Sequence, residues 1–278
     1  MSKGLISVFI ILFSLTQQSH AETARSSNEL TLGVFPYISS TRLIRLYMPL
    51  TQYLESKMNK KVRLLSAPDF KTFIQRTQAQ QYDIIYTAPH FAQLAEQQKK
   101  YNRLSRFSRD LTGTIFVNAD SPITRIKELE GKIVSLPDEL AIVSAMGEIH
   151  LRKKGLRVGK NISLLNTPTH NNAIISVKNN TASAGIIASP VFEIYNKKNK
   201  EKLKRIEQTD PVPSAMFMVS TKVSKQDTNK LNHAMMEFTK SNYAEPFFSG
   251  TPMVGLKPIS DTDMQGLTKY VELLKQKL

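Results

Sequence analysis

From Leu30 onward, strand-like apolar segments alternate with amphipathic helical segments, and this alternation restricts the fold more than any other feature of the sequence. Runs such as LTLGVF and YDIIYT are each followed by apolar residues at helical spacing. Strands are predicted at 30–35, 61–66, 82–87, 113–120, 132–136, 161–167, 182–188 and 215–221, and helices at 41–58, 70–80, 89–99, 123–131, 139–154, 170–180, 224–241 and 260–276. This order implies βαβ units, a mostly parallel sheet and an α/β fold.

The same pattern predicts two lobes joined by a hinge. Strand-like segments with turn residues on their flanks lie near 111–118 and 210–218, and the segment between them is long enough for a complete small α/β unit. We expect lobe I to combine 22–117 with 215–278 and lobe II to span 118–214, a clamshell with two crossovers. Ligands bind beyond the carboxyl ends of parallel strands, so the loops after 30–35, 82–87, 132–136 and 162–167 should line the cleft.

The first 21 residues have the pattern of a signal peptide. Lys3 supplies a basic start, GLISVFIILFSL is an apolar core, and Ser19-His20-Ala21 resembles a signal peptidase site, with cleavage expected after Ala21. The sequence contains no cysteine, which excludes disulfides, thiolate metal sites, cysteine nucleophiles and a lipid-attachment cysteine. We therefore expect export to the periplasm.

The chain is basic, with a formal net charge of +15. The densest basic run, NKKNKEKLKR at 196–205, contains no aromatic residue and accompanies no nucleic-acid motif. We interpret it as a solvated face and expect no nucleic-acid partner. The sequence also lacks the G-x-S-x-G and H-E-x-x-H motifs of hydrolases and metalloenzymes, so we expect no catalytic site, no metal and no cofactor.

Several segments resemble the periplasmic phosphate, phosphite and phosphonate-binding proteins of ABC importers, a branch of the type II solute-binding proteins. The resemblance covers roughly 30 to 275 and is most specific in NADSPITRIKELEGKIVSL and THNNAIISVKNNTASAGII, together with LTLGVFPY near the start. It implies a two-lobed type II periplasmic-binding-protein fold that closes on a small ligand. It also implies no catalysis and delivery of the ligand to a membrane partner.

The resemblance carries over only part of the family's binding site. Family members place Ser-Thr-Ser after the strand at 132–136, where this chain has Glu139, Leu140 and Ala141. A carboxylate repels a phosphonate and the two aliphatic residues donate nothing, so the anion site is altered. Glu139 could pair with a cationic ligand, or it could be a helix-start acid favoured by the helix dipole.

Other positions keep the character of a solute site. An acid used for aminoalkyl ligands corresponds to Ala215, whereas the family's histidine is retained as His170 at the start of a helix. The residues that the resemblance and their placement make candidates for ligand contact are Tyr37, Tyr86, Thr87, Glu139, Ser144, His170 and Asn171. The tyrosines could equally be core residues at the edge of the cleft. His90 is interpreted as a helix cap or surface residue, and His150 and His233 as surface or packing residues.

The sequence thus predicts a monomeric periplasmic protein that closes on a small polar solute and presents it to a membrane partner. That partner is the permease of an ABC importer or, alternatively, the periplasmic domain of a sensor kinase or cyclase. A third hypothesis is an interaction protein that has lost its ligand and docks through the basic face at 196–205.

Overall fold

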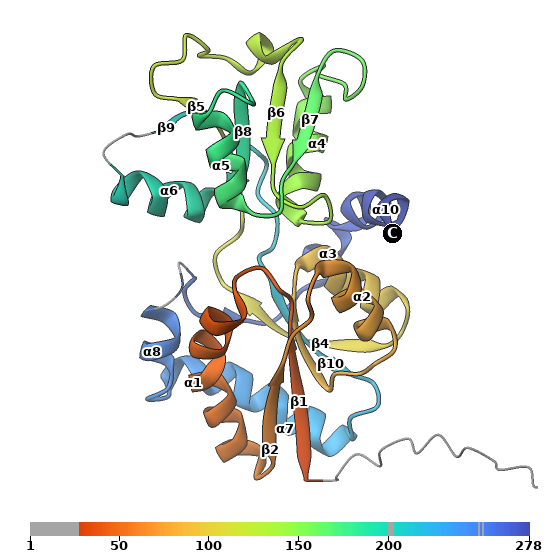
Figure 1. Ribbon diagram of the computed structural model, residues 1–278. Helices are drawn as coiled ribbons and strands as arrows, with labels where there is room; N and C mark the ends of the chain where they lie inside the picture. The colour runs from red at the N-terminus through yellow and green to blue at the C-terminus, as the bar shows by residue number, and fades with distance from the viewer. Residues whose placement is uncertain (1–27, 200–202, 250, 252) are drawn as a thin grey trace, which may run out of the picture.

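Two separate β-sheets form the centres of two lobes (Figure 1). The structure is a computed structural model that describes residues 28–199, 203–249, 251 and 253–278; the predicted signal peptide, 1–21, lies outside the described residues. Within the described part of the chain, no helix is long and apolar enough to cross a membrane.

Lobe I contains a six-stranded sheet of order β11-β4-β10-β3-β1-β2. Strands β1 and β2 and strands β1 and β3 pair in parallel, while β10 runs antiparallel between β3 and β4. Its strands are β1 (Glu29–Val34), β2 (Lys61–Leu65), β3 (Ile84–Thr87), β4 (Tyr101–Phe107), β10 (Met216–Ser220) and β11 (Leu256–Lys257). Its helices are α1 (Ser40–Met58), α2 (Phe70–Gln78), α3 (Pro89–Gln97), α7 (Lys225–Glu237), the 3-10 turn η2 (Phe238–Lys240), α8 (Ala244–Ser249), α9 (Asp261–Gln265) and α10 (Thr268–Lys277).

Lobe II contains a five-stranded sheet of order β7-β6-β8-β5-β9. Strand β6 is parallel to β7 and β8, and β5 is antiparallel to β8 and β9. Its elements are β5 (Gly113–Asn118), the 3-10 turn η1 (Ile126–Leu129), β6 (Ile133–Leu136), α4 (Ile142–Lys153), β7 (Ser163–Asn166), α5 (His170–Lys178), β8 (Ala184–Ala188), α6 (Ser189–Lys198) and β9 (Leu203–Gln208).

The chain passes between the lobes twice, and the two crossovers are hydrogen-bonded to each other. The Leu111 N–H donates to the Val212 carbonyl at 2.8 Å, and the Val212 N–H donates back at 2.9 Å. The predicted boundary at 117/118 falls inside β5, and the pairing of β5 with β8 and β9 places that whole strand in lobe II. The hinge on this side therefore lies before Gly113.

Side-chain caps explain several helix starts. Asp69, Thr169 and Ser224 each accept a hydrogen bond from a backbone N–H in the first turn of α2, α5 and α7. Close packing requires a glycine in β1, because a Cβ added to Gly33 would lie 2.4 Å from the Tyr82 ring. Glycine there lets that ring pack against the strand.

Five elements were not predicted and three predicted helices differ. The sequence interpretation missed β4, α6, β9, α8 and β11, and the helix predicted at 123–131 is only the 3-10 turn η1. The helix predicted at 139–154 begins only at Ile142, because Pro137 and the turn after it precede the first helical hydrogen bonds. The helix predicted at 260–276 is two helices, α9 and α10, separated by Gly266 and Leu267.

One hydrophobic cluster extends through both lobes. It joins lobe I residues such as Phe91 and Phe107 to lobe II residues such as Leu140 and Ile142, and a smaller cluster lies around Phe116 and Phe192. The C-terminal helix α10 packs against α3 of lobe I and α4 of lobe II (Figure 1). The lobes are thus connected by packing as well as by the crossovers.

Candidate functional site

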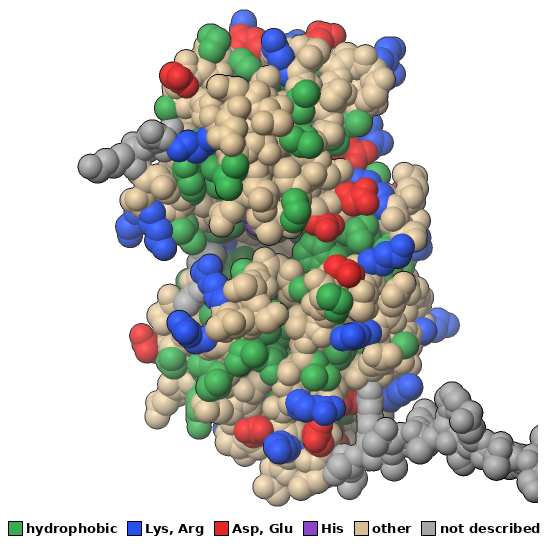
Figure 2. Space-filling model, in the orientation of Figure 1, with side chains coloured by type: hydrophobic (Ala, Val, Ile, Leu, Met, Phe, Trp, Pro, Cys, Tyr) green, Lys and Arg blue, Asp and Glu red, His purple; other side chains and the backbone are tan. Residues whose placement is uncertain are grey.

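The candidate site is the gap between the two lobes. The space-filling view shows a hollow between them on the face that it presents (Figure 2). The strands β1, β3, β6, β7 and β8 are each followed by the start of a helix, and no acidic side chain lies in the first turn of α1, α3, α4, α5 or α6. Helix starts without acids leave backbone N–H groups for an anionic or polar ligand.

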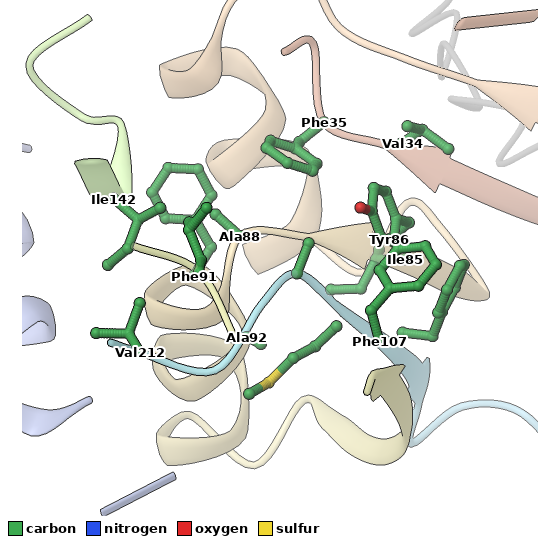
Figure 3. Packing of buried hydrophobic residues seen from close by; sticks show 14 of the residues in the cluster. Val34, Phe35, Ile85, Tyr86, Ala88, Phe91, Ala92, Phe107, Ile142 and Val212 are labelled. Atoms are coloured by element: carbon green, nitrogen blue, oxygen red, sulfur yellow. The ribbon is translucent and has the colours of Figure 1, made fainter. Parts of the chain in front are cut away.

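At the end of this gap where α4 begins, near 140–142 (the α4 end), the lobes are in direct contact. The His90 side chain of α3 forms a hydrogen bond with the Leu140 carbonyl of lobe II at 2.9 Å, through Nε2. Ile142 points toward the ring of Phe91, and Val212 of the crossover lies nearby (Figure 3). His90 is 1% exposed, so its interpretation as a cap or surface residue is wrong. No local sequence signal connects it with Leu140.

Glu139 has a different position from the one predicted. It lies in the turn before α4 rather than in the helix, it is exposed, and the first residues of α4 have no side-chain cap. A hydrogen bond links the Leu140 N–H to Asp138 at 2.8 Å, and Lys277 of α10 donates to the Glu139 carbonyl at 3.5 Å. The interpretation of Glu139 as a helix-start acid is therefore wrong, and its backbone faces α10.

Ser144 also differs from its prediction as a ligand residue. Its side chain is 2% exposed, and its hydroxyl donates to the carbonyls of Asp138 at 2.8 Å and Pro137 at 3.2 Å. The hydroxyl thus stabilises the turn before α4 within lobe II. It has no access to a solute in this arrangement.

Three tyrosines from lobe I form a buried hydroxyl chain. The Tyr37 and Tyr47 hydroxyls lie 3.0 Å apart, and Tyr47 also bonds to the Tyr86 hydroxyl. Burial raises the pKa of Tyr37 to about 12 and the pKa of Tyr47 and of Tyr86 well above the usual value. Phe35 stacks on Tyr37 with ring centres 4.7 Å apart. All three hydroxyls therefore stay protonated.

Of these predicted ligand residues, only Tyr37 is partly exposed. Tyr86 is 3% exposed and Thr87 is fully buried, and the Thr87 hydroxyl has no hydrogen-bond partner among the described residues. The side chains of Tyr86 and Thr87 thus lie behind the surface of the gap, in the core of lobe I.

We predict that Tyr47→Phe lowers the free energy of unfolding by about 1 kcal/mol, because it removes the shared partner of two buried hydroxyls. Urea denaturation at pH 7 measures the change. Tyr195→Phe on α6 is the matched control, since the Tyr195 hydroxyl makes no hydrogen bond within the described chain. An equal loss in both variants would contradict a role for the hydroxyl chain.

On the other side of the gap, α5 begins with His170 and Asn171. The Thr169 side chain accepts from the Asn172 N–H at 3.1 Å and so fixes this helix start. The His170 Nδ1 atom is buried without a partner among the described residues, and burial lowers the pKa of His170 to about 4. Asn171 is exposed. A neutral imidazole and an exposed amide can both donate to and accept from a polar ligand.

The remaining positions noted in the sequence do not form a metal site within the described residues. Ala215 is buried where the crossover enters β10. His150 packs in α4 and bonds to Glu207 at 3.0 Å, whereas His233 is exposed. Among the described residues, no three histidine, cysteine or acidic side chains lie close enough to hold a metal ion.

The two-lobed arrangement with a ligand gap defines the class of type II periplasmic binding proteins, and solved structures agree. A Xanthomonas citri protein bound to ATP has a TM-score of 0.77 at 20% identity and covers 90% of this chain and 99% of its own. PhnD1 of Prochlorococcus marinus in complex with methylphosphonate has a TM-score of 0.77 at 14% identity, with coverage of 90% and 98%. A binding protein component of an ABC phosphonate transporter from Pseudomonas aeruginosa has a TM-score of 0.75 at 16% identity, with coverage of 90% and 87%.

The sequence profile of the periplasmic substrate-binding protein of phosphonate ABC transporters matches residues 32–264. The chain belongs to this family, as the resemblance in its sequence indicated. Members of the family are periplasmic binding proteins of ABC importers that deliver a ligand to a permease, and they are not enzymes.

Proposed function

We propose that this protein binds a small polar solute in the periplasm, as a monomer, and presents it to the permease of an ABC importer. The family match over residues 32–264 is the observation that carries this proposal. Closure of the two lobes about the crossovers near Leu111 and Val212 produces the form that the permease recognises.

We further propose that the anion site differs from that of the phosphonate binders. The loop before α4 presents Leu140 and Ala141, which are aliphatic, and Glu139, whose carbonyl accepts from α10. The start of α5 supplies neutral groups, the His170 imidazole and the Asn171 amide, and Tyr37 is the partly exposed tyrosine of lobe I. These three side chains are our candidates for direct contact with the solute.

A thermal-shift screen of protein that has been unfolded and refolded, so that no ligand is carried over, tests the proposal. The panel contains phosphate, phosphite, alkyl- and aminoalkylphosphonates, sulfonates, amino acids and polyamines. A ligand at a hundred times its dissociation constant adds about 2.7 kcal/mol of stability. For a chain of this size, the expected rise in Tm is roughly 5 to 10 °C.

The same screen, repeated with variants, tests the proposed site residues and the alternative functions. His170→Ala should abolish the shift that the wild type gives, whereas His233→Ala, on an exposed helix face, should leave it unchanged. A large shift with a phosphonate would contradict the altered anion site. No shift with any solute would favour the interaction protein or a sensor kinase or cyclase as partner, and pull-down from a membrane extract would then separate a permease from a sensor.

A further inference from the structure

The contact between the lobes at the α4 end is closed by residues far apart in the sequence. His90 of α3, Leu140 before α4, and Leu273 and Lys277 of α10 line one narrow crevice, which has no volume that a water molecule could fill. His90, Leu140 and Ile142 are each less than 9% exposed. Lobe I, lobe II and the C-terminal helix thus meet here without an intervening space.

The hydrogen bond across this contact fixes the state of His90. The Leu140 carbonyl can only accept, so Nε2 carries the proton and donates it. The other ring nitrogen, Nδ1, is buried and has no partner among the described residues. A buried donor that lost Leu140 would be left unsatisfied at a cost, which favours keeping the two lobes together.

The α10 helix adds a second connection between the same parts. Lys277 pairs with Glu148 of α4 at 3.1 Å, and both side chains are about one-fifth exposed. Tyr270, Leu273 and Leu274 of α10 lie along the same crevice. Since α10 also packs on α3, separation of the lobes at this end would break contacts with both helices.

This contact also covers the N-terminus of α4. The N–H groups of Ile142 and Val143 make no hydrogen bond within the described part of the chain, and both residues are buried. They are unpaired donors of the kind that bind oxyanions at helix starts. Because both residues are buried beside the His90–Leu140 contact, their N–H groups are withheld from a solute.

We infer that His90, the loop before α4 and α10 hold the lobes together at the α4 end, which confines the solute to the other end of the gap, where α5 begins (the α5 end). His90 is then a specificity-determining residue, because its contact with Leu140 withholds the first N–H groups of α4 from an oxyanion. The part of this inference that concerns the solute rests on the proposed function; the part that concerns the contact between the lobes does not.

Hydrogen exchange of the ligand-free protein, followed by mass spectrometry, tests the contact directly. His90→Phe keeps an aromatic ring but removes the donor, and peptides covering 139–145 should exchange about fivefold faster, as expected for a lost hydrogen bond of ordinary strength. His90→Gln keeps an N–H donor and should restore most of the protection. His233→Ala should exchange like the wild type. Unchanged exchange of 139–145 in His90→Phe would overturn the inference.

Inorganic phosphate and methylphosphonate, each at millimolar concentration, test the specificity. In the wild type neither probe should protect 139–145, whereas in His90→Ala the vacated space should let phosphate protect this segment at least about threefold. Protection of 139–145 in the wild type, or no difference between the two proteins, would contradict the role of His90. If no solute protects any segment, the proposed function fails, and the ligand-free comparison still decides the contact.

Discussion

Replacing Arg106 with alanine is expected to lower the free energy of unfolding by about 3 to 5 kcal/mol, the usual cost of breaking a buried ion pair. Arg106 in β4 is 3% exposed. Its Nε and Nη2 atoms donate to both carboxylate oxygens of Asp263 at 2.9 and 2.7 Å, and Nη1 donates to Asp110 at 2.7 Å. The substitution leaves the Asp263 charge at the start of α9 without its cation.

The pKa of Asp263 supports this expectation. Burial alone would raise the pKa of this carboxyl, but hydrogen bonds from Arg106 and from the Ser260 N–H hold it below the usual value. Without Arg106, Asp263 loses the strongest of the hydrogen bonds that lower its pKa, and the α9 segment that precedes α10 loses its anchor on β4. We therefore expect the substitution also to weaken the packing of α10 on α3.

Urea denaturation at pH 7 measures the effect of the Arg106 substitution. Arg103→Ala is the matched control, because Arg103 lies on the same strand and pairs with Glu96 and the exposed Asp261. We expect it to cost no more than about 1 kcal/mol. The double variant Arg106→Met with Asp263→Asn should recover part of the loss. A loss of less than 1 kcal/mol in Arg106→Ala would show that the pair contributes little.

Stability should also fall as the pH is lowered from 7 to 4, with His90 as a major single contributor. Burial lowers the pKa of His90 to about 3, against a usual value of 6.5. The unfolded chain therefore binds a proton before the folded protein does, so stability is complete above pH 6.5 and is lost as the pH falls toward 3. At pH 4 the loss from this group is about 3 kcal/mol.

His170 acts in the same direction because its pKa is also lowered, to about 4. Its contribution should be smaller, since the side chain retains some exposure to solvent. Acidic groups with lowered pKa values, such as Asp227 and Asp263, add to the loss at the acid end of the range. The wild-type profile alone thus cannot assign the effect to one residue.

A comparison of variants isolates His90. Urea midpoints between pH 7 and pH 4 should decline less steeply in His90→Gln than in the wild type, because glutamine keeps a donor for Leu140 and does not titrate. His233→Gln should follow the wild-type profile. Parallel profiles for all three proteins would mean that His90 binds a proton equally well in the folded and unfolded states.

Much of the fold could be predicted because its signals are local. The leucines of α1, the apolar strands β1, β3 and β8, and the basic end of α4 followed by Gly155 are all readable from neighbouring residues. Strand β4 was missed because YNRLSRF contains two arginines, and the partner that allows Arg106 to be buried lies 157 residues away in sequence. Strand β9 was missed because LKRIEQ lies at a sheet edge and resembles a solvated basic run.

The site was less predictable than the fold. The sequence brought attention to the loop at 137–141, but it could not show that His90 reaches the Leu140 carbonyl from the other lobe. Nor could it show that the Ser144 hydroxyl turns back to the Asp138 carbonyl. Both facts depend on how the lobes and the turn pack, and neither leaves a pattern at fixed spacing.

The position of β10 has a consequence for the order in which the two sheets can be completed as the chain emerges from its N-terminal end. Lobe II is continuous, so every strand of its sheet exists once Gln208 has been added. The sheet of lobe I instead needs β10 between β3 and β4, and β10 ends only at Ser220. The first hundred residues therefore cannot complete their sheet until the middle of the chain has emerged, and the sheet that begins first is the one completed last.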